Sequence, residues 1–167
     1  MKSAPPPVFI FVGHSNAGKT TLVEQLIPEF IRRGRRVATI KHAHHAVQLD
    51  TEGKDSWRYK QAGAALSMLV TADALQLVAD TGGKREPARL AERFLGEADL
   101  VLAEGFSHAA GPKIEVLRRE TGKPPRCGIE DGLIAIVTDC AGLYPALPHF
   151  ALDDIGALAD FLLRWHD

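Results

Sequence analysis

The segment Gly13–Thr20 reads GHSNAGKT and matches the phosphate-binding pattern G-x-x-x-x-G-K-[ST] at every fixed position. Gly13 and Gly18 let the backbone turn tightly and approach phosphate oxygens. The amides of residues 16–20 can then point inward as an anion nest at the positive end of a following helix. Lys19 supplies a mobile charge for the β- and γ-phosphates, and Thr20 supplies a hydroxyl ligand for Mg²⁺. The pattern predicts a nucleoside triphosphate-binding loop.

An acid follows a second hydrophobic run. The residues 99–103 read DLVLA, and Glu104 comes next. An acid at such a strand end is typical of the second Mg²⁺ element of phosphate-loop proteins. Glu is one methylene longer than the more usual Asp, so we expect Glu104 to contact Mg²⁺ through water. The alternative is a surface acid at the end of a strand.

Two acids lie in the polar segment that follows the second expected strand. Asp50 is a candidate for a metal contact or for orienting an attacking water, as this segment does in related architectures. A solvated loop acid is the alternative for Asp50. Asp55 has the same candidate role, but it is also well placed to begin a short helix as its N-cap.

A histidine cluster, His42, His44 and His45, stands directly after Lys41. Histidine is a common ligand for Zn²⁺, Ni²⁺ or Cu²⁺, so the cluster could bind a metal. Together with Lys41 it could instead line an anionic pocket for a phosphate or a pterin-like ligand. We favour the anionic pocket, because no partner residue stands at a strong metal-binding spacing. A solvated loop remains a third interpretation.

Asp139 follows the hydrophobic run Leu133–Val137 and Thr138. An Asp in this position can accept both N1–H and N2–H of guanine, a bidentate match that adenine lacks. The usual Asn-Lys-x-Asp signature is absent. The alternative is an Asx turn before Gly142.

Strands and helices are expected to alternate along the chain and so to position these residues. Continuous apolar runs predict parallel strands covered on both faces, at 8–12, 36–42, 100–103 and 133–137. Helices are expected at 19–33, 55–62, 87–95 and 154–165. A hairpin at 66–71 and 74–79 and a strand at 113–117 are expected to be antiparallel and peripheral. These elements predict an α/β, three-layer sandwich of the P-loop NTPase type, with a mostly parallel sheet and an antiparallel β extension.

Composition bounds the class of protein. The 167 residues have 46% hydrophobic and 25% charged residues, so we expect one globular domain over 1–167. A net charge of −1 gives no support to nucleic-acid or membrane binding. The first apolar run enters the phosphate loop and does not read as an export signal, which favours the cytoplasm. Cys127 and Cys140 are then expected to be reduced thiols.

Several sequence runs taken together identify a family more specifically than the phosphate-binding loop alone. The runs GHSNAGKTTL, ATIKHAHH, LDTEGKDSWRYKQAGA, DLVLAEGFSH and PKIEVLR occur in this order. Together they closely resemble the MobB family of molybdopterin-guanine dinucleotide biosynthesis adaptor proteins, over essentially the whole chain. Two departures stand out: Glu52 where Pro is common in the family, and Ser107 where Lys is common. The second puts any phosphate-binding role of that position in doubt.

The resemblance implies a GTP-binding P-loop protein, usually a homodimer, with weak GTPase activity. Such a protein assists the guanylyltransferase MobA in attaching GMP to molybdopterin, and molybdopterin itself is a candidate ligand. The expected cofactors are GTP and Mg²⁺, with the metal held by Thr20 and Glu104, and Lys19 and Asp50 are the expected catalytic residues. The residues expected to bind the nucleotide are Gly13, His14, Ser15, Asn16, Ala17, Gly18, Lys19, Thr20, Thr21 and Asp139.

Other functions remain open at this stage. A small-molecule kinase would place paired arginines over the phosphates, for which Arg118, Arg119 and Arg126 are candidates, but no acceptor-site base is evident. A metal-insertion GTPase would use the histidine cluster as ligands. A binding module would hold nucleotide without hydrolysing it. The absence of an obvious arginine finger or catalytic base favours slow hydrolysis.

Overall fold

The computed structural model describes residues 4–43, 47–83 and 85–166. The chain divides into two compact units, one of residues 1–42 and 86–167 and one of residues 43–85. The expectation of a single domain over 1–167 stays a prediction.

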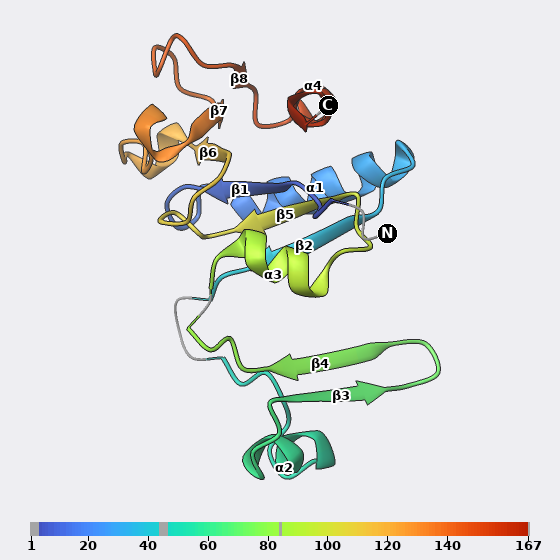
Figure 1. The fold of residues 1–167 in the computed structure, drawn as a ribbon. Helices are drawn as coiled ribbons and strands as arrows, with labels where there is room; N and C mark the ends of the chain where they lie inside the picture. The colour runs from blue at the N-terminus through green and yellow to red at the C-terminus, as the bar shows by residue number, and fades with distance from the viewer. Residues whose placement is uncertain (1–3, 44–46, 84, 167) are drawn as a thin grey trace. The chain divides into compact units, whose positions relative to one another are not determined.

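The first unit is built on a six-stranded sheet in the order β2-β5-β1-β6-β7-β8, and every pairing is parallel. The strands are β1 (Val8–Val12), β2 (Val37–Lys41), β5 (Leu100–Glu104), β6 (Lys113–Leu117), β7 (Leu133–Thr138) and β8 (His149–Phe150). Figure 1 shows β1 between β5 and β6. The carboxyl ends of β1, β5 and β2 therefore meet at one edge of the sheet, where ligands bind in folds of this kind.

The position of β6 corrects one expectation. The strand at 113–117 is parallel and central, whereas alternating polar and apolar residues had suggested an antiparallel, peripheral strand. All five residues are buried, including the polar Lys113 and Glu115. The Lys113 ammonium donates to the Asp131 carbonyl, and Glu115 accepts two backbone N–H groups. Polar residues that find such partners can occupy a buried strand. The alternation of polar and apolar residues in 113–117 therefore did not mean that one face of the strand is exposed to solvent.

Helices α1 (Lys19–Arg32) and α4 (Ile155–His166) cover one face of this sheet. Their apolar side chains pack with Phe9 and Phe11 of β1 in the main core. The opposite face carries Ile10 and Val12, which pack with Phe106, Ala109 and Cys127 from the connecting segments. Helix α3 (Pro87–Phe94) contacts β1. These layers confirm the predicted α/β sandwich.

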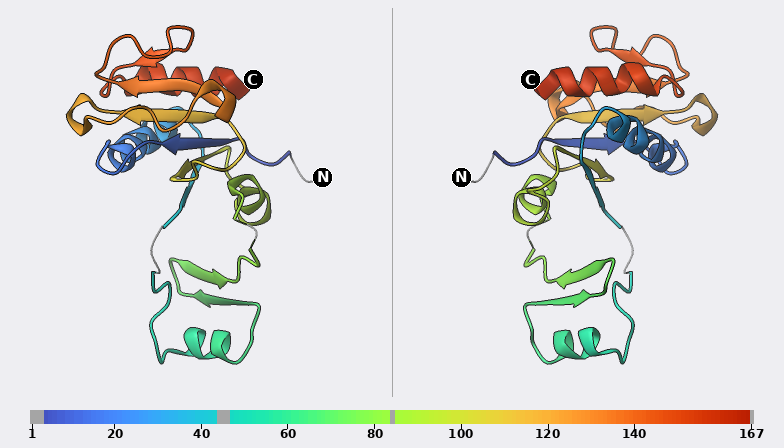
Figure 2. Two further views of the ribbon diagram at one scale, coloured as in Figure 1. Left: turned by 90° about the vertical axis from the view of Figure 1, so that its left-hand side faces the viewer. Right: turned by 90° about the vertical axis from the view of Figure 1, so that its right-hand side faces the viewer.

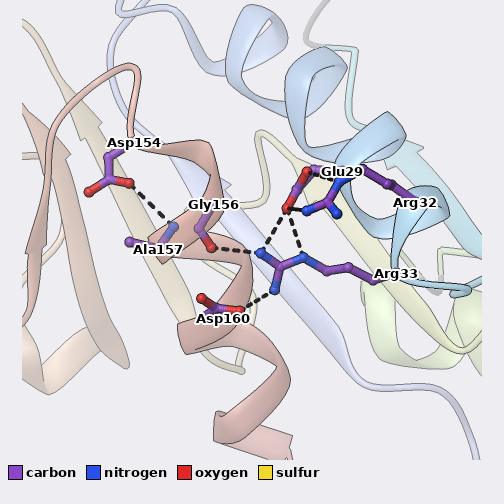
Figure 3. A network of polar contacts seen from close by, with 7 residues as sticks. All are labelled: Glu29, Arg32, Arg33, Asp154, Gly156, Ala157 and Asp160. Atoms are coloured by element: carbon purple, nitrogen blue, oxygen red, sulfur yellow. Dashed lines mark hydrogen bonds and ion pairs between the residues drawn. The ribbon is translucent and has the colours of Figure 1, made fainter.

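Helix α1 continues through Pro28 without a break. Arg33, at the C-terminal end of α1, joins α1 to α4, as Figure 3 shows. The Arg33 guanidinium forms ion pairs with Glu29 and Asp160 and donates to the Gly156 carbonyl at 3.0 Å. One side chain thus links the two helices of this layer.

The second unit contains helix α2 (Asp55–Gln61) and a hairpin of β3 (Leu66–Val70) and β4 (Leu75–Ala79). The hairpin is antiparallel, as predicted, and α2 lies beside β3 (Figure 2). The N-cap of α2 is Lys54, with no side-chain cap, so Asp55 does not cap this helix as expected. At the start of α4, by contrast, the Asp154 carboxylate accepts from Ala157 N at 3.3 Å.

The segment 118–131 forms two short 3₁₀ turns, Arg119–Thr121 and Ile129–Asp131. The segment is partly buried, because Cys127 packs in the core on the second face of the sheet. Over the residues that the structure describes, no helix has both the length and the apolar character that a membrane span requires.

Candidate nucleotide-binding site

The glycine-rich loop connects β1 to α1 with the backbone that the motif predicts. Gly13, Asn16 and Gly18 all have positive φ, at 141°, 65° and 94°. A Cβ on Gly13 would lie 2.3 Å from the Val116 carbonyl oxygen of β6. The first glycine is therefore required both by its conformation and by the close approach of two strands.

Most of the loop remains accessible. Ser15, Asn16, Thr20 and Thr21 are exposed, and Ala17 is buried beneath them. The ring Nε2 of His14 lies 3.0 Å from the Pro124 carbonyl oxygen.

Arg118, at the carboxyl end of β6, packs against this loop. Its Nε donates to the Ala17 carbonyl at 3.1 Å, and a Cβ on Gly18 would lie 3.0 Å from the same nitrogen. The second fixed glycine therefore makes room for an arginine as well as for a turn. The sequence offered Arg118 only as a lid residue for a kinase, whereas here it is part of the loop's support.

Lys19 folds back along the loop. Its Nζ donates to the His14 carbonyl at 2.8 Å. Partial burial lowers the pKa of Lys19, and the nearby Glu104 carboxylate opposes that effect. The side chain thus places one positive charge inside the turn, where the sequence motif puts the phosphate-binding cation.

Thr20 and Glu104, the two predicted metal ligands, are in contact. The Thr20 hydroxyl lies 3.0 Å from both Glu104 carboxylate oxygens and donates to them. These are hard oxygen ligands of the kind that Mg²⁺ prefers, so the pair fits that ion. A third residue, which the sequence did not single out for this corner, completes it: Lys41 at the end of β2 donates to Thr20 Oγ1 at 3.2 Å and lies 3.4 Å from Glu104 Oε2.

Glu115 is a buried acid that was not among the residues expected from the sequence. Its Oε1 accepts from Arg126 N at 2.9 Å, and its Oε2 accepts from Cys127 N at 3.2 Å. Burial raises the pKa of Glu115, which the two backbone hydrogen bonds oppose. The signal in the sequence was an acid between Ile114 and Val116 in an apolar strand. Glu115 anchors the segment 118–131 beside the loop.

Asp139 joins the ends of β6 and β7. Its Oδ1 accepts from Arg119 N at 2.7 Å, and the Arg119 guanidinium donates to the Asp139 carbonyl at 2.9 Å. The backbone hydrogen bond from Arg119 lowers the pKa of the Asp139 carboxyl, so the group is ionised near neutral pH. The side chain is exposed. Its contact with guanine stays a prediction.

Asp50 belongs to the second unit, where its Oδ1 accepts from Thr51 N at 2.8 Å. Asp55 is the first residue of α2 and forms an ion pair with Arg58. The proposed role of Asp50 toward metal or water is not tested by these contacts and stays a prediction.

The histidine cluster is described only at His42. Its backbone N–H donates to the Glu104 carbonyl at 2.9 Å, and its ring lies 5.1 Å from the ring of Phe106. His44 and His45 lie outside the described residues. Among the residues that are described, no three His, Cys, Asp or Glu side chains are grouped so that they could hold a metal ion. The metal-binding interpretation of the cluster is therefore untested.

Fold and loop together define the class of protein: a P-loop NTPase fold, with the glycine-rich turn at the end of the central strand and an acid at the end of its neighbour. A model of the family described as MobB, molybdopterin guanine dinucleotide synthesis protein B, matches residues 8–139. The chain belongs to the MobB family.

Curated relatives agree with that assignment. The chain is 40% identical over 164 residues to the molybdopterin-guanine dinucleotide biosynthesis adapter protein of Haemophilus influenzae, covering 95% of this chain and 89% of the relative. It is 36% identical to the Escherichia coli protein of the same name, covering 95% and 93%. Among solved structures, Bacillus subtilis MobB superposes with a TM-score of 0.72 at 31% identity, covering 95% of this chain and 96% of that one.

Proposed function

We propose that this chain is a cytoplasmic adaptor that binds Mg·GTP through Gly13–Thr21 and assists a MobA-type guanylyltransferase in forming molybdopterin guanine dinucleotide. The relatives' names supply the pathway. The observation that supports nucleotide binding is the contact of Thr20 with Glu104 beside the loop that carries Lys19. This is the arrangement that phosphoryl-binding sites use to hold a metal and a cation next to the phosphates.

Each residue has a distinct role in this proposal. The loop amides and Lys19 bind the phosphates, the Thr20 hydroxyl ligates Mg²⁺, and Glu104 holds the metal through water. Bound Mg²⁺ neutralises phosphate charge. Asp139 binds the guanine edge, and Asp50 orients water for a hydrolysis that is slow, because the sequence offers no obvious arginine finger. Molybdopterin is a further candidate ligand of the adaptor.

The second unit supports a homodimer. The hairpin exposes Leu66, Met68, Val70 and Leu75, whose exposed fractions lie between 45% and 66%. A two-stranded sheet alone is marginally stable in water and gains from a further apolar surface. We therefore assign the β extension to contact with a second copy of this chain.

The loop is tested with Lys19→Ala and a fluorescent guanine nucleotide. Removing a charged hydrogen-bond donor to phosphate is expected to weaken binding roughly ten- to a hundredfold. Arg36→Ala is the matched control, since Arg36 pairs with Asp99 before β2 begins, at the opposite end of the sheet. An affinity that Lys19→Ala leaves unchanged would contradict the proposed site.

The adaptor role is tested by reconstitution. A purified MobA-type guanylyltransferase, molybdopterin-bound molybdenum and limiting GTP are combined with and without this chain. Faster formation of the guanine dinucleotide with the wild-type chain, but not with Lys19→Ala, is expected. Transfer of the labelled γ-phosphate of GTP to a small molecule would instead indicate a kinase.

A further inference from the structure

The lysine at the end of β2 occupies an unusual place. Lys41 and Glu104 are direct partners in the parallel register of β2 and β5. Lys41 Nζ lies 3.4 Å from Glu104 Oε2 and 3.2 Å from Thr20 Oγ1. The ammonium therefore contacts both side chains that the proposed site offers to a metal.

We propose that Lys41 is a built-in counter-cation of the metal site, which holds Thr20 and Glu104 in the metal-free state and is exchanged for Mg²⁺ when Mg·nucleotide binds. The inference rests on the proposed function and deepens it by assigning a control of metal entry. It concerns a residue outside the phosphate-binding motif.

Competition follows from the chemistry of the two cations. Mg²⁺ demands near-ideal octahedral geometry with short metal–oxygen distances and keeps several waters. A lysine ammonium in contact with the same hydroxyl and carboxylate oxygens occupies part of that shell. Two positive charges at this separation also repel each other. Binding of the ion is therefore expected to displace the Lys41 ammonium.

The surroundings of Lys41 allow this exchange. Its side chain is 62% exposed, while that of Glu104 is 14% exposed. The acid is held in place and the lysine is the mobile partner, on a flexible four-carbon stem. In the absence of Mg²⁺, the same ammonium adds a positive charge beside the loop and favours an anionic nucleotide.

The proposal makes two opposite predictions for Lys41→Met, which keeps an unbranched apolar stem and removes the charge. Without Mg²⁺, the variant is expected to bind a fluorescent guanine nucleotide more weakly than wild type. With Mg²⁺ titrated in, the variant is expected to reach half-saturation at a lower metal concentration, because its competitor is gone.

The measured quantity is the coupling factor, the ratio of the nucleotide dissociation constant in EDTA to that in saturating Mg²⁺. Lys41→Met is expected to raise this factor by about two- to fivefold, the range that corresponds to losing an exposed ion pair. Arg36→Met is the control, because it removes the same charge from another exposed ion pair, with Asp99, at the opposite end of the sheet. Its coupling factor should equal that of wild type.

Two results would overturn the inference while leaving the proposed function intact. Equal weakening with and without Mg²⁺ would make Lys41 a plain phosphate ligand. If Lys41→Met changed neither the coupling factor nor the nucleotide affinities, the contact of Lys41 with Glu104 would be a surface ion pair without a role in metal binding. A wild-type chain that binds no guanine nucleotide under either condition would instead overturn the proposed function, and the inference with it.

Discussion

Gly13 is the residue of the candidate site that tolerates replacement least. Its φ of 141° is disfavoured for any side chain, and its Cβ would lie 2.3 Å from the Val116 carbonyl oxygen. The loop and β6 cannot separate without loss of the strand pairing between β1 and β6. The same glycine thus serves both the phosphate-binding turn and the central sheet.

Gly13→Ala is therefore expected to lower the free energy of unfolding by roughly 1–3 kcal/mol or more, the cost of a strained backbone plus a clash. Urea denaturation measures the change. Gly34→Ala is the matched control, because Gly34 also has positive φ, at 73°, but a Cβ there would meet nothing within 4 Å. Equal losses in the two variants would show that the contact with Val116 is unimportant.

Glu115 of β6 holds the segment 118–131 through its carboxylate. It is fully buried, and it accepts the N–H groups of Arg126 and Cys127 in the segment that lies beside the loop. Leaving the buried N–H donor of Cys127 without an acceptor costs about 1–3 kcal/mol, and loss of the half-buried hydrogen bond from Arg126 adds a smaller cost.

Glu115→Ala is accordingly expected to destabilise the chain by about this amount and to speed hydrogen exchange at the amides of residues 126 and 127. Exchange followed by NMR or mass spectrometry measures the effect. Glu120→Ala makes the same chemical change at an exposed position of the same segment and should alter neither quantity. Unchanged protection in Glu115→Ala would refute the anchoring role.

The contact between α1 and α4 depends on ionised carboxylates. Hydrogen bonds from Arg32 and Arg33 lower the pKa of Glu29 from the ordinary 4.5 to about 2. Below pH 4.5 the unfolded chain therefore binds a proton that the folded chain does not, and stability falls as the pH decreases toward 2. Above pH 4.5 the contribution of Glu29 is fully present.

Glu29→Gln should lower stability at neutral pH and flatten the loss of stability between pH 4.5 and 2. Denaturant midpoints measured across this range test the expectation. Asp153→Asn serves as a control, since Asp153 is an exposed acid that forms no ion pair with the residues that the structure describes. If stability fell as steeply between pH 4.5 and 2 in Glu29→Gln as in wild type, other carboxylates would be responsible for most of the loss.

At the scale of the whole molecule, the hairpin unit is the part that the proposed dimer would bury. Val70 and Leu75 face each other across β3 and β4 and are 66% and 63% exposed. A charge placed there costs the isolated chain little, because both side chains already lie in solvent.

Val70→Lys is expected to dissociate the dimer, with sedimentation equilibrium reporting the mass of a monomer at concentrations where wild type is dimeric. Ile31→Lys is the control: it replaces an apolar side chain of α1 that is 60% exposed and should leave the mass unchanged. A dimeric Val70→Lys would place the interface elsewhere.

The sequence by itself determined the order of the helices and of every strand except the two-residue β8, together with the loop between Gly13 and Thr20, because hydrophobic runs and glycine spacing are local properties. It also indicated Glu104, since an acid directly after an apolar strand is visible without any contact. Membership of the MobB family followed from ordered motifs along the chain.

Only the tertiary structure decided which strand is central and which side chains share a corner. β6 can lie buried between β1 and β7 because Lys113 and Glu115 find backbone partners in residues 126–131, in the segment between β6 and β7. Lys41 meets Thr20 and Glu104 through the register of β2 with β5. Pairing across a sheet joins residues that no spacing in the sequence relates, and hydrogen bonding to distant backbone is what allows a polar side chain to be buried.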